Sequence, residues 1–596
     1  MPSYTAPLAD LQFVLDELLQ LQRYQDLPGF EELGPELIAA ILEEGGRFCQ
    51  EVLAPLNAAG DREGCRWHDG TVTTPKGFKE AYRAYVEGGW NGLTGERRYG
   101  GQGLPYVLGT AFGEMSSAAN MAFAMYPGLT GGAIDAISAG GSEEQKRLYL
   151  PPMIEGRWSG TMNLTEPHCG TDLGLLRTRA EPQADGSYRI SGTKIFISAG
   201  EHDLTENIIH LVLARIPGGP PGVKGISLFI VPKFLVNPDG SLAERNRVRC
   251  GRIEEKMGIH GNATCEMQYD GAVGYLIGEP HKGLKVMFVM MNAARLGVAV
   301  QGLAIATVAY QNAVVYARER LQGRALTGPK APERAADPII VHPDVRRMLL
   351  VGRAFTEGAR ALACWVALQA DLAHKHPDAQ VCQDAEDLVA LLTPVVKAYF
   401  TDKGFEVANL ALQCYGGHGY IREWGMEQFV RDARIAQIYE GANGIQALDL
   451  VGRKLPADGG RAIQRFLALV GGFCREQSEN AELAPYVAPL AKALERLQKA
   501  TVWLQEQGPR NPDHAAAGSM DYLHLLALTA LGWQWAQIAA VARRRLAEGS
   551  GDGGFYRNKL ITARFFMERM LPDTAAHLAK LSAGAQALME LPAEGF

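Results

Sequence analysis

Along the first 160 residues, apolar side chains recur with the spacing of amphipathic helices. The first such stripe follows the i, i+3, i+4, i+7 pattern and consists of Leu11, Val14, Leu15, Leu18 and Leu21. Similar stripes cover residues 37–52 and 77–88, and an apolar run reaches residue 137 after the glycine-rich loop at 100–103. The pattern predicts an N-terminal helical domain over residues 1–160, with an added helix at its start.

Between residues 161 and 283 the helical period gives way to short runs rich in β-branched and aromatic residues. These runs cover residues 188–198, 208–216, 225–234 and 265–269. Asp-Gly pairs at 185, 239 and 270 have the composition of turns between antiparallel strands. The sequence therefore predicts a β domain over residues 161–283, inserted between helical domains.

Helical spacing returns after residue 283 and continues to the end of the chain. Long helices are expected at 284–321, 343–373 and 384–415, with a kink at Pro394 and a surface loop at 323–338. A last segment, 455–596, is rich in Ala and Leu and breaks at 508–512. The predicted fold class is mainly α with an inserted β domain: a helical bundle over 284–454 and an additional C-terminal helical domain over 455–596.

Composition excludes several classes of protein. The net charge is −7, which does not favour nucleic acid as a partner, and the nine cysteines contain no Cys-x-x-Cys pair. Scattered thiols of this kind are typical of a reduced, cytoplasmic protein. The first residues lack a basic segment followed by an apolar core, so no secretory signal is expected. The most apolar stretch, 527–542, contains Gln534 and Gln537, which predicts a buried helix and no membrane span.

Three short segments carry candidate chemistry. Residues 164–172 form a hydroxyl-rich turn that offers donors to a phosphate or a flavin edge, or else caps a short helix. Residues 194–200 form a strand that ends in a turn, where Phe196 and Ser198 could flank an aromatic ring or simply pack. Glu440 lies in a glycine-flanked loop between apolar helices, where it serves as a reactive carboxylate or as a cap of the next helix. The histidines lack the spacing of metal ligands, so no metal site is predicted.

In this order, the three segments resemble the two signatures of the acyl-CoA dehydrogenase family. The first is Thr165-Glu166-Pro167 through Gly170-Thr171-Asp172. The second runs from Gln413-Cys414-Tyr415-Gly416-Gly417-His418-Gly419-Tyr420 through Arg431-Asp432-Ala433-Arg434 to Ile438-Tyr439-Glu440-Gly441. The resemblance covers residues 100–455. It implies a helical N domain, a middle domain built as an antiparallel barrel or sandwich, a four-helix bundle and FAD as cofactor.

The resemblance also implies a role for individual residues. Glu440 matches the base that removes the α-proton of a fatty acyl-CoA while a hydride leaves Cβ for the flavin. The positions that match FAD contacts are Met162, Leu164, Thr165, Gly170, Thr171, Phe196, Ser198, Arg320, Gln413, Gly416, Gly417 and Ala442. Among them, Arg320 and, from a neighbouring subunit, Gln413, Gly416 and Gly417 match contacts to the adenosine-diphosphate half of FAD. Those that match substrate contacts are Thr171, Asn292, Arg295, Tyr439 and Gly441.

Three positions depart from the family pattern. Ala442 replaces the usual threonine after Glu-Gly, so one hydroxyl contact to FAD is missing. The segment Arg320-Leu321-Gln322-Gly323 is shorter than the family's Arg-Lys-x-Phe-Gly and lacks its aromatic ring. Asn292 stands where an acid usually contacts CoA, and its amide still forms hydrogen bonds.

The added terminal segments make the layout similar to that of larger bacterial dehydrogenases. These include enzymes for medium or long acyl-CoA and the 3-methylthiopropionyl-CoA dehydrogenases. The resemblance implies fatty acid β-oxidation, an electron-transferring flavoprotein as acceptor and a homodimer, because the added domain covers the surface where two dimers would meet. Two alternatives remain open at this point: an acyl-CoA oxidase, and a flavoprotein of this fold that binds DNA.

Overall fold

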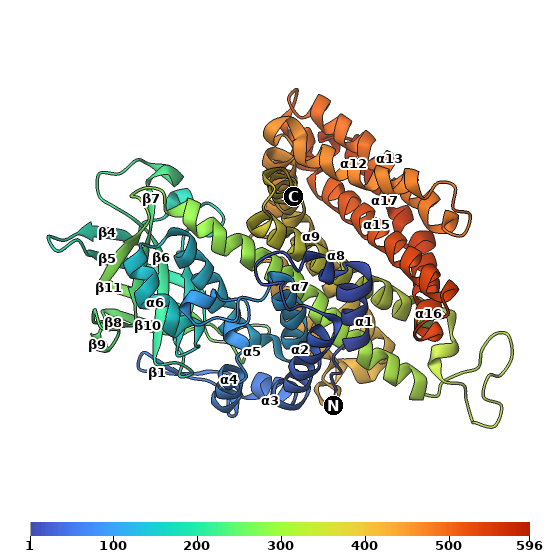
Figure 1. Ribbon diagram of the computed structural model, residues 1–596, viewed down its shortest axis with the longest axis horizontal. Coiled ribbons are helices and arrows are strands. Elements are labelled where there is room, and N and C mark those ends of the chain that lie inside the picture. Colours follow the sequence, from blue (N-terminus) through green and yellow to red (C-terminus); the bar gives the residue numbers. More distant parts are fainter. Residues whose placement is uncertain (1) are drawn as a thin grey trace. The chain divides into compact units, whose positions relative to one another are not determined.

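The sheet domain predicted in the middle of the chain is present in the computed structural model, which describes residues 2–596 (Figure 1). The chain divides into two units. One consists of residues 45–297 and holds the sheet, and the other joins residues 1–44 to residues 298–596 and is helical.

Seven strands form the main sheet of the first unit. They are β3 (Trp158–Asn163), β4 (Arg179–Pro182), β5 (Tyr188–Ser198), β6 (Asn207–Arg215), β7 (Ile226–Pro232), β10 (Val248–Ile253) and β11 (Thr264–Ile277). The pairs β4–β5, β5–β11, β11–β7, β7–β6 and β6–β4 close a ring, with β3 and β10 on its outside. Strands β6 and β7 are buried almost throughout, because core side chains cover both of their faces. The domain is therefore a small barrel.

Two details of the sheet differ from the sequence-based expectation. The Asp270-Gly271 pair makes no turn; it forms a bulge inside β11, where the register with β5 shifts between Asp270 and Ala272. The sheet is also not wholly antiparallel, because β3 pairs with β6 in parallel. That pairing requires a long crossover, and the chain supplies it through β4 and β5.

The remaining elements of the first unit are helices and two short hairpins. The helices are α3 (Ala54–Glu63), α4 (Phe78–Glu87), α5 (Tyr106–Gly140) and α6 (Glu143–Ile154). The hairpins are β1 (Arg66–His68) with β2 (Thr71–Thr73), and β8 (Phe234–Val236) with β9 (Leu242–Arg245). Helix α6 begins at a reciprocal cap between Ser142 and Gln145 and, like α5, packs on β3. The helical segment α2 (Pro35–Phe48) lies at the boundary between the units.

A bundle of long helices forms the centre of the second unit. It contains α7 (Gly283–Glu319, from residue 298), α8 (Pro343–Lys375), α9 (Ala379–Cys414), α10 (Met426–Arg434) and α11 (Asn443–Asp449). Helix α9 is one helix with Pro394 in its interior, and the kink expected there stays a prediction. Helices α7 and α9 approach closely at Gly302 and Gly404: a β-carbon at Gly302 would lie 2.5 Å from the Phe400 carbonyl oxygen.

The C-terminal segment adds a second helical layer. Its helices are α12 (Arg461–Glu476), α13 (Ala484–Gln507), α14 (Pro512–Ala517), α15 (Ser519–Ala547), α16 (Gly553–Arg569), α17 (Thr574–Ser582) and α18 (Gln586–Met589). Helix α15 is central and packs on α13, α16 and α17 as well as on α8 and α9 (Figure 1). By length and composition, α7 and α15 could each cross a membrane. In α15, 83% of the apolar window is buried, as expected of a core helix.

The N-terminal stripe of leucines forms α1 (Leu8–Gln12) and a π-helical continuation, Phe13–Leu18. Asp10 is buried here and pairs with Arg360 of α8 and Lys559 of α16; Lys559 also lies 2.8 Å from Glu357. These contacts tie the first helix to the C-terminal layer.

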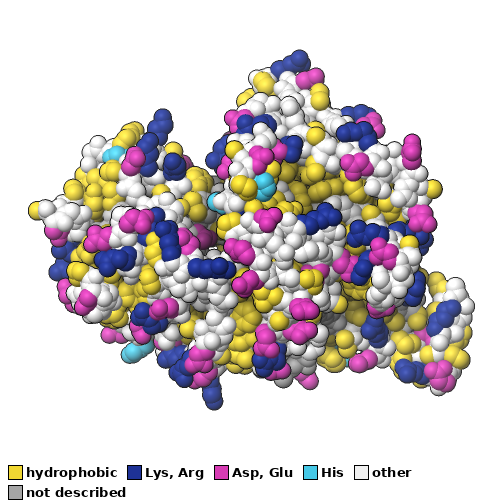
Figure 2. All heavy atoms as spheres, viewed as in Figure 1, with side chains coloured by type: hydrophobic (Ala, Val, Ile, Leu, Met, Phe, Trp, Pro, Cys, Tyr) yellow, Lys and Arg dark blue, Asp and Glu magenta, His cyan; other side chains and the backbone are white. Residues whose placement is uncertain are grey.

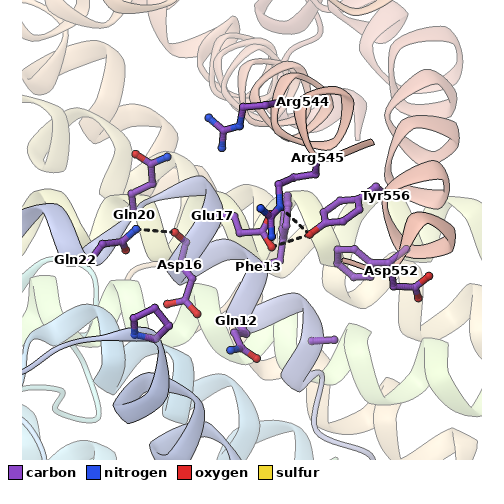
Figure 3. A pocket seen from close by; sticks show the side chains of 13 residues that line it. Gln12, Phe13, Asp16, Glu17, Gln20, Gln22, Arg544, Arg545, Asp552 and Tyr556 are labelled. Carbon is purple, nitrogen blue, oxygen red and sulfur yellow. Dashed lines mark hydrogen bonds and ion pairs between the residues drawn. The ribbon is translucent and has the colours of Figure 1, made fainter. Parts of the chain in front are cut away.

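Beside that ion cluster, residues at the start of the chain and around the α15–α16 turn line an open pocket of about 590 Å³ (Figure 3). The Tyr556 hydroxyl donates to Glu17 over 2.8 Å, and Glu17 also pairs with Arg545 at 3.1 Å.

Candidate active site

On the barrel, the first two candidate segments lie side by side. The Ile195 backbone N–H donates to the Thr165 carbonyl over 2.9 Å, and the fully buried Lys194 ammonium donates to the Leu164 carbonyl over 2.9 Å. Burial lowers the pKa of Lys194 to about 8, although the nearby Glu166 carboxylate acts in the opposite direction. These bonds bring Leu164 and Thr165 next to the strand end that carries Phe196 and Ser198, while Met162 lies on β3 just before them.

Glu166 closes the signature loop at its base. Its carboxylate accepts hydrogen bonds from the Arg177 N–H (2.8 Å), the Thr178 N–H (3.0 Å), the Thr178 hydroxyl (2.5 Å) and Lys194 (2.9 Å). Gly170 and Thr171 lie exposed on this loop. Glu166, His168 and Cys169 also bring three metal-ligand types within 4.8 Å of one another, but the bonds to Glu166 already account for its position.

Phe196 has an unusual conformation and exposure. Its backbone φ is +58°, a region that bulky side chains seldom adopt, and 60% of the residue is exposed. Ala199, at the end of the same strand, has φ +54°. Strain of this kind persists where the surrounding structure enforces it, and it is common at ligand sites. The strand end therefore presents an exposed aromatic ring, directly after the residue that bonds to the Thr165 carbonyl and two residues before Ser198.

The two substrate candidates of α7 contact each other. The Arg295 guanidinium, buried to all but 7%, donates to the Asn292 side-chain oxygen over 3.4 Å, while Asn292 is exposed. Asn292 therefore accepts this hydrogen bond through its side-chain oxygen, and its side chain is otherwise exposed.

In the helical unit, Glu440 lies in a loop between the 3-10 turn Ile435–Gln437 and α11. Glu440 has φ +58° and Gly441 has φ +89°, so two consecutive residues adopt the left-handed region. Glycine accepts this conformation freely, whereas glutamate is strained in it. The loop holds the Glu440 backbone in a conformation that its sequence does not favour.

Side chains from α9 and α11 fix the carbonyls of this loop. The Lys397 ammonium, fully buried in α9, donates to the Gly441 carbonyl (2.7 Å) and to Asn443 Oδ1 (2.9 Å). The Gln446 amide donates to the Glu440 carbonyl over 3.0 Å. The Tyr439 hydroxyl donates to Gln301 of α7. We call the Tyr439–Ala442 segment, together with these contacts, the base loop.

Asp402 accepts hydrogen bonds from residues on both sides of the base loop. One of its oxygens accepts hydrogen bonds from Asn443 and from Gln437, each over 2.7 Å. Burial acts to raise the pKa of the Asp402 carboxyl, but hydrogen bonds from His524, Gln437 and Asn443 bring it below its usual value. The carboxylate is therefore ionised at neutral pH.

Sequence reasoning missed Lys397, Asp402 and Asn443. A signal was available, because Lys397, Thr401 and Asp402 fall at i, i+4 and i+5 within an otherwise apolar run of α9. A charged side chain inside such a run is expected to have a buried partner.

The residues expected at the adenosine half of FAD lie at one end of the bundle. Near the end of α7, Tyr316 stacks on Tyr415 with ring centres 4.0 Å apart, and its hydroxyl lies 2.9 Å from His418 Nδ1. This stack joins the end of α7, just before Arg320, to the end of α9 and the turn after it, where Gln413, Gly416 and Gly417 lie. All four of these candidates are exposed.

Family models match almost the whole chain. The chain matches the N-terminal domain of acyl-CoA dehydrogenase over residues 36–157, the middle domain over 161–272 and the C-terminal domain over 281–455. Residues 463–592 match a further domain described as acetyl-CoA dehydrogenase C-terminal like.

Individual relatives agree with this assignment. A 3-methylmercaptopropionyl-CoA dehydrogenase of Ruegeria pomeroyi is 45% identical over 98% of this chain and 99% of its own length. The broad-specificity linear acyl-CoA dehydrogenase FadE5 of Mycobacterium tuberculosis is 35% identical, with 96% of each chain covered.

Solved structures share the fold at lower identity. An acyl-CoA dehydrogenase of Bacillus anthracis complexed with FAD has a TM-score of 0.74 at 20% identity, covering 92% of this chain and 89% of that one. Caenorhabditis elegans ACDH-11 in complex with C11-CoA has a TM-score of 0.77 at 19% identity, covering 96% of this chain and 92% of its own. The chain belongs to the acyl-CoA dehydrogenase family of FAD-binding oxidoreductases.

Proposed function

We propose that this protein dehydrogenates an acyl-CoA between Cα and Cβ, with Glu440 as the base that removes the α-proton. The observation that carries the proposal is the strained left-handed backbone of Glu440, held by the buried Lys397 and by Gln446. Such a conformation costs about 1–3 kcal/mol. A carboxylate on a backbone fixed in this way is what proton abstraction requires.

The residues of the barrel fit FAD. The exposed Phe196 ring and the hydroxyls of Thr165 and Ser198 suit the face and edge of a flat, polar ring system. Gly170 and Thr171 offer backbone N–H groups on an exposed loop, as a pyrophosphate requires. When bound, FAD supplies the acceptor for the hydride from Cβ.

The base loop supplies what the α-proton transfer needs from the protein. The α-carbon of a thioester is a weak acid, so the negative charge that develops on the carbonyl oxygen must be stabilised. The backbone N–H of Glu440 is the natural donor to that oxygen. On the other side of the same residue, Gln446 holds the Glu440 carbonyl, and Lys397 holds the Gly441 carbonyl that follows, so the backbone next to this N–H is fixed. Exclusion of water strengthens the hydrogen bond from this donor and makes the carboxylate more basic.

Two classes of acyl group are candidates for the substrate. The size of the chain resembles that of dehydrogenases for medium or long acyl-CoA. The 45% identity along the whole chain supports a 3-methylmercaptopropionyl thioester instead. We place that compound first among the substrates to be tested.

The electron acceptor and the assembly are part of the same proposal: an electron-transferring flavoprotein and a homodimer. Peroxide release during turnover would indicate an oxidase instead. For the DNA-binding alternative a basic face is required. On the face shown in Figure 2, basic and acidic side chains are interspersed over the C-terminal helices, which does not favour it.

The test is an anaerobic titration of the FAD-loaded protein with 3-methylmercaptopropionyl-CoA and a series of straight-chain acyl-CoAs. Bleaching of the flavin by one class is the expected result. Glu440→Gln should keep FAD while its bleaching rate falls by at least about 1,000-fold. Glu423→Gln, an exposed glutamate in the same unit, is the matched control and should bleach normally. Normal bleaching by the Glu440 variant would refute the assignment of the base.

A further inference from the structure

The added C-terminal domain contacts the network beneath the base loop. His524 of α15 lies with its Nε2 3.1 Å from Oδ2 of Asp402. The other oxygen of Asp402 accepts the hydrogen bonds of Asn443 and Gln437, which lie on either side of the base loop. A continuous chain of polar contacts thus leads from the C-terminal domain to the residues flanking Glu440.

His524 is itself fixed on several sides. Its ring makes an edge contact with Tyr399 of α9 at 5.2 Å and with His577 of α17 at 5.3 Å. His577 is in turn held by Asp521, with 2.7 Å between Nδ1 and the carboxylate oxygen. Helix α15 packs against both α9 and α11, the helices whose Lys397 and Gln446 hold the base loop. The imidazole is therefore held in one orientation towards Asp402.

Removal of His524 would change how Asp402 is held. A carboxylate bound through both oxygens has a fixed plane, whereas one bound through a single oxygen can rotate about its terminal torsion. Rotation would misalign the 2.7 Å bonds to Asn443 and Gln437. Asn443 also accepts from Lys397, so the disturbance would extend to the Gly441 carbonyl.

We propose that His524 is a positioning residue, through which the C-terminal domain sets the place of Glu440 by way of Asp402 and Asn443. The inference rests on the proposed role of Glu440 as the base. Under this proposal, the additional domain helps to position the base, besides burying apolar surface. Displacement of a reacting group by about 1 Å costs on the order of 100-fold in rate, so a loosened support has a measurable consequence.

The experiment compares three variants of the full-length, FAD-loaded protein. His524→Leu removes the donor at similar volume, and His524→Gln keeps an N–H donor at a similar reach. Tyr522 lies on the same helix as His524, and Tyr522→Phe is the matched control, because it removes a buried 2.8 Å hydrogen bond to Thr501 of α13 without touching Asp402. Stopped-flow bleaching of the flavin over a range of acyl-CoA concentrations gives the limiting rate and the apparent Kd separately.

We expect His524→Leu to lower the limiting rate about tenfold with little change in the apparent Kd. His524→Gln should stay within about threefold of the wild type, and Tyr522→Phe within about twofold. In an Asp402→Asn background, His524→Leu should have no further effect, because both act through one contact.

Equal limiting rates for His524→Leu and Tyr522→Phe would overturn the inference. So would a loss that His524→Gln does not restore, because the donor to Asp402 would then be irrelevant. Failure of the wild type to bleach with any acyl-CoA would refute the proposed function instead, so the two failures are distinguishable.

Discussion

Substitution of Lys397 by Met is the sharpest test of how the base loop is built. Methionine has nearly the length and volume of lysine, so packing in α9 is retained while the ammonium is lost. The buried Nζ makes hydrogen bonds of 2.7 Å to the Gly441 carbonyl and 2.9 Å to Asn443. The change leaves two buried acceptors without this donor.

The magnitude follows from two opposing contributions. Hydrogen bonds from a charged donor are worth about 1.5–3 kcal/mol each, which gives a loss of about 3–6 kcal/mol for the pair. Removal of the buried ammonium offsets part of this loss, because the folded state no longer has to bear the desolvation free energy of a buried charge. A net cost of about 2 kcal/mol at the loop corresponds to a limiting rate of flavin reduction lowered by about 30-fold.

The assay is anaerobic stopped-flow bleaching at saturating acyl-CoA, with FAD content and thermal unfolding measured on the same samples. Lys499→Met is the control, because Lys499 is 63% exposed and makes an i,i+4 surface pair with Glu495. Such pairs contribute at most about 0.5 kcal/mol, so the control should behave like the wild type. If Lys397→Met binds FAD, remains folded and reduces its flavin within about threefold of the wild-type rate, the reasoning is wrong.

Three further predictions concern stability and are checked by thermal or denaturant unfolding. Asp10→Ala, which leaves the buried cations of Arg360 and Lys559 without this carboxylate, should cost about 3–5 kcal/mol, and an unchanged midpoint would contradict the ion cluster. Burial raises the pKa of Asp16 to about 6, above its unfolded value of about 4. The folded state therefore loses stability as the pH rises from about 4 to about 6, because the buried carboxyl must ionise. Asp16→Asn should be about 1 kcal/mol more stable than wild type at pH 7.5 and equal to it at pH 3.5. Gly302→Ala should cost about 1–3 kcal/mol by forcing α7 away from α9, whereas the same change at Gly297, where a β-carbon meets no atom within 4 Å, should not cost stability.

Periodicity predicted most of the element types, because burial of one face imposes a repeat that can be read locally. The predicted strand at 188–198 coincides with β5, and the helix expected at 343–373 is α8. The prediction failed at Asp270-Gly271, where local composition favours a turn. Pairing of β11 with β5 on both sides of that point, and with β7 at the strand's end, keeps the strand continuous instead. Strand continuity there is a property of the neighbours, which local sequence does not contain.

The candidate base was identified because Glu440 and its glycine belong to a short contiguous motif. Lys397, Asp402 and His524 were not identified, since they lie roughly 40 to 80 residues away along the chain and no local pattern relates them to Glu440.

By itself, the sequence determined the helix–sheet–helix order, the added terminal segments and the motifs that make this chain an acyl-CoA dehydrogenase family member. Those features depend on side-chain periodicity and short-range spacing. The tertiary structure alone decided that Glu440 is held in a left-handed conformation, and that a buried lysine, an aspartate and a histidine of the C-terminal domain support its loop. Buried polar groups must find partners in space, and folding brings those partners from distant parts of the chain.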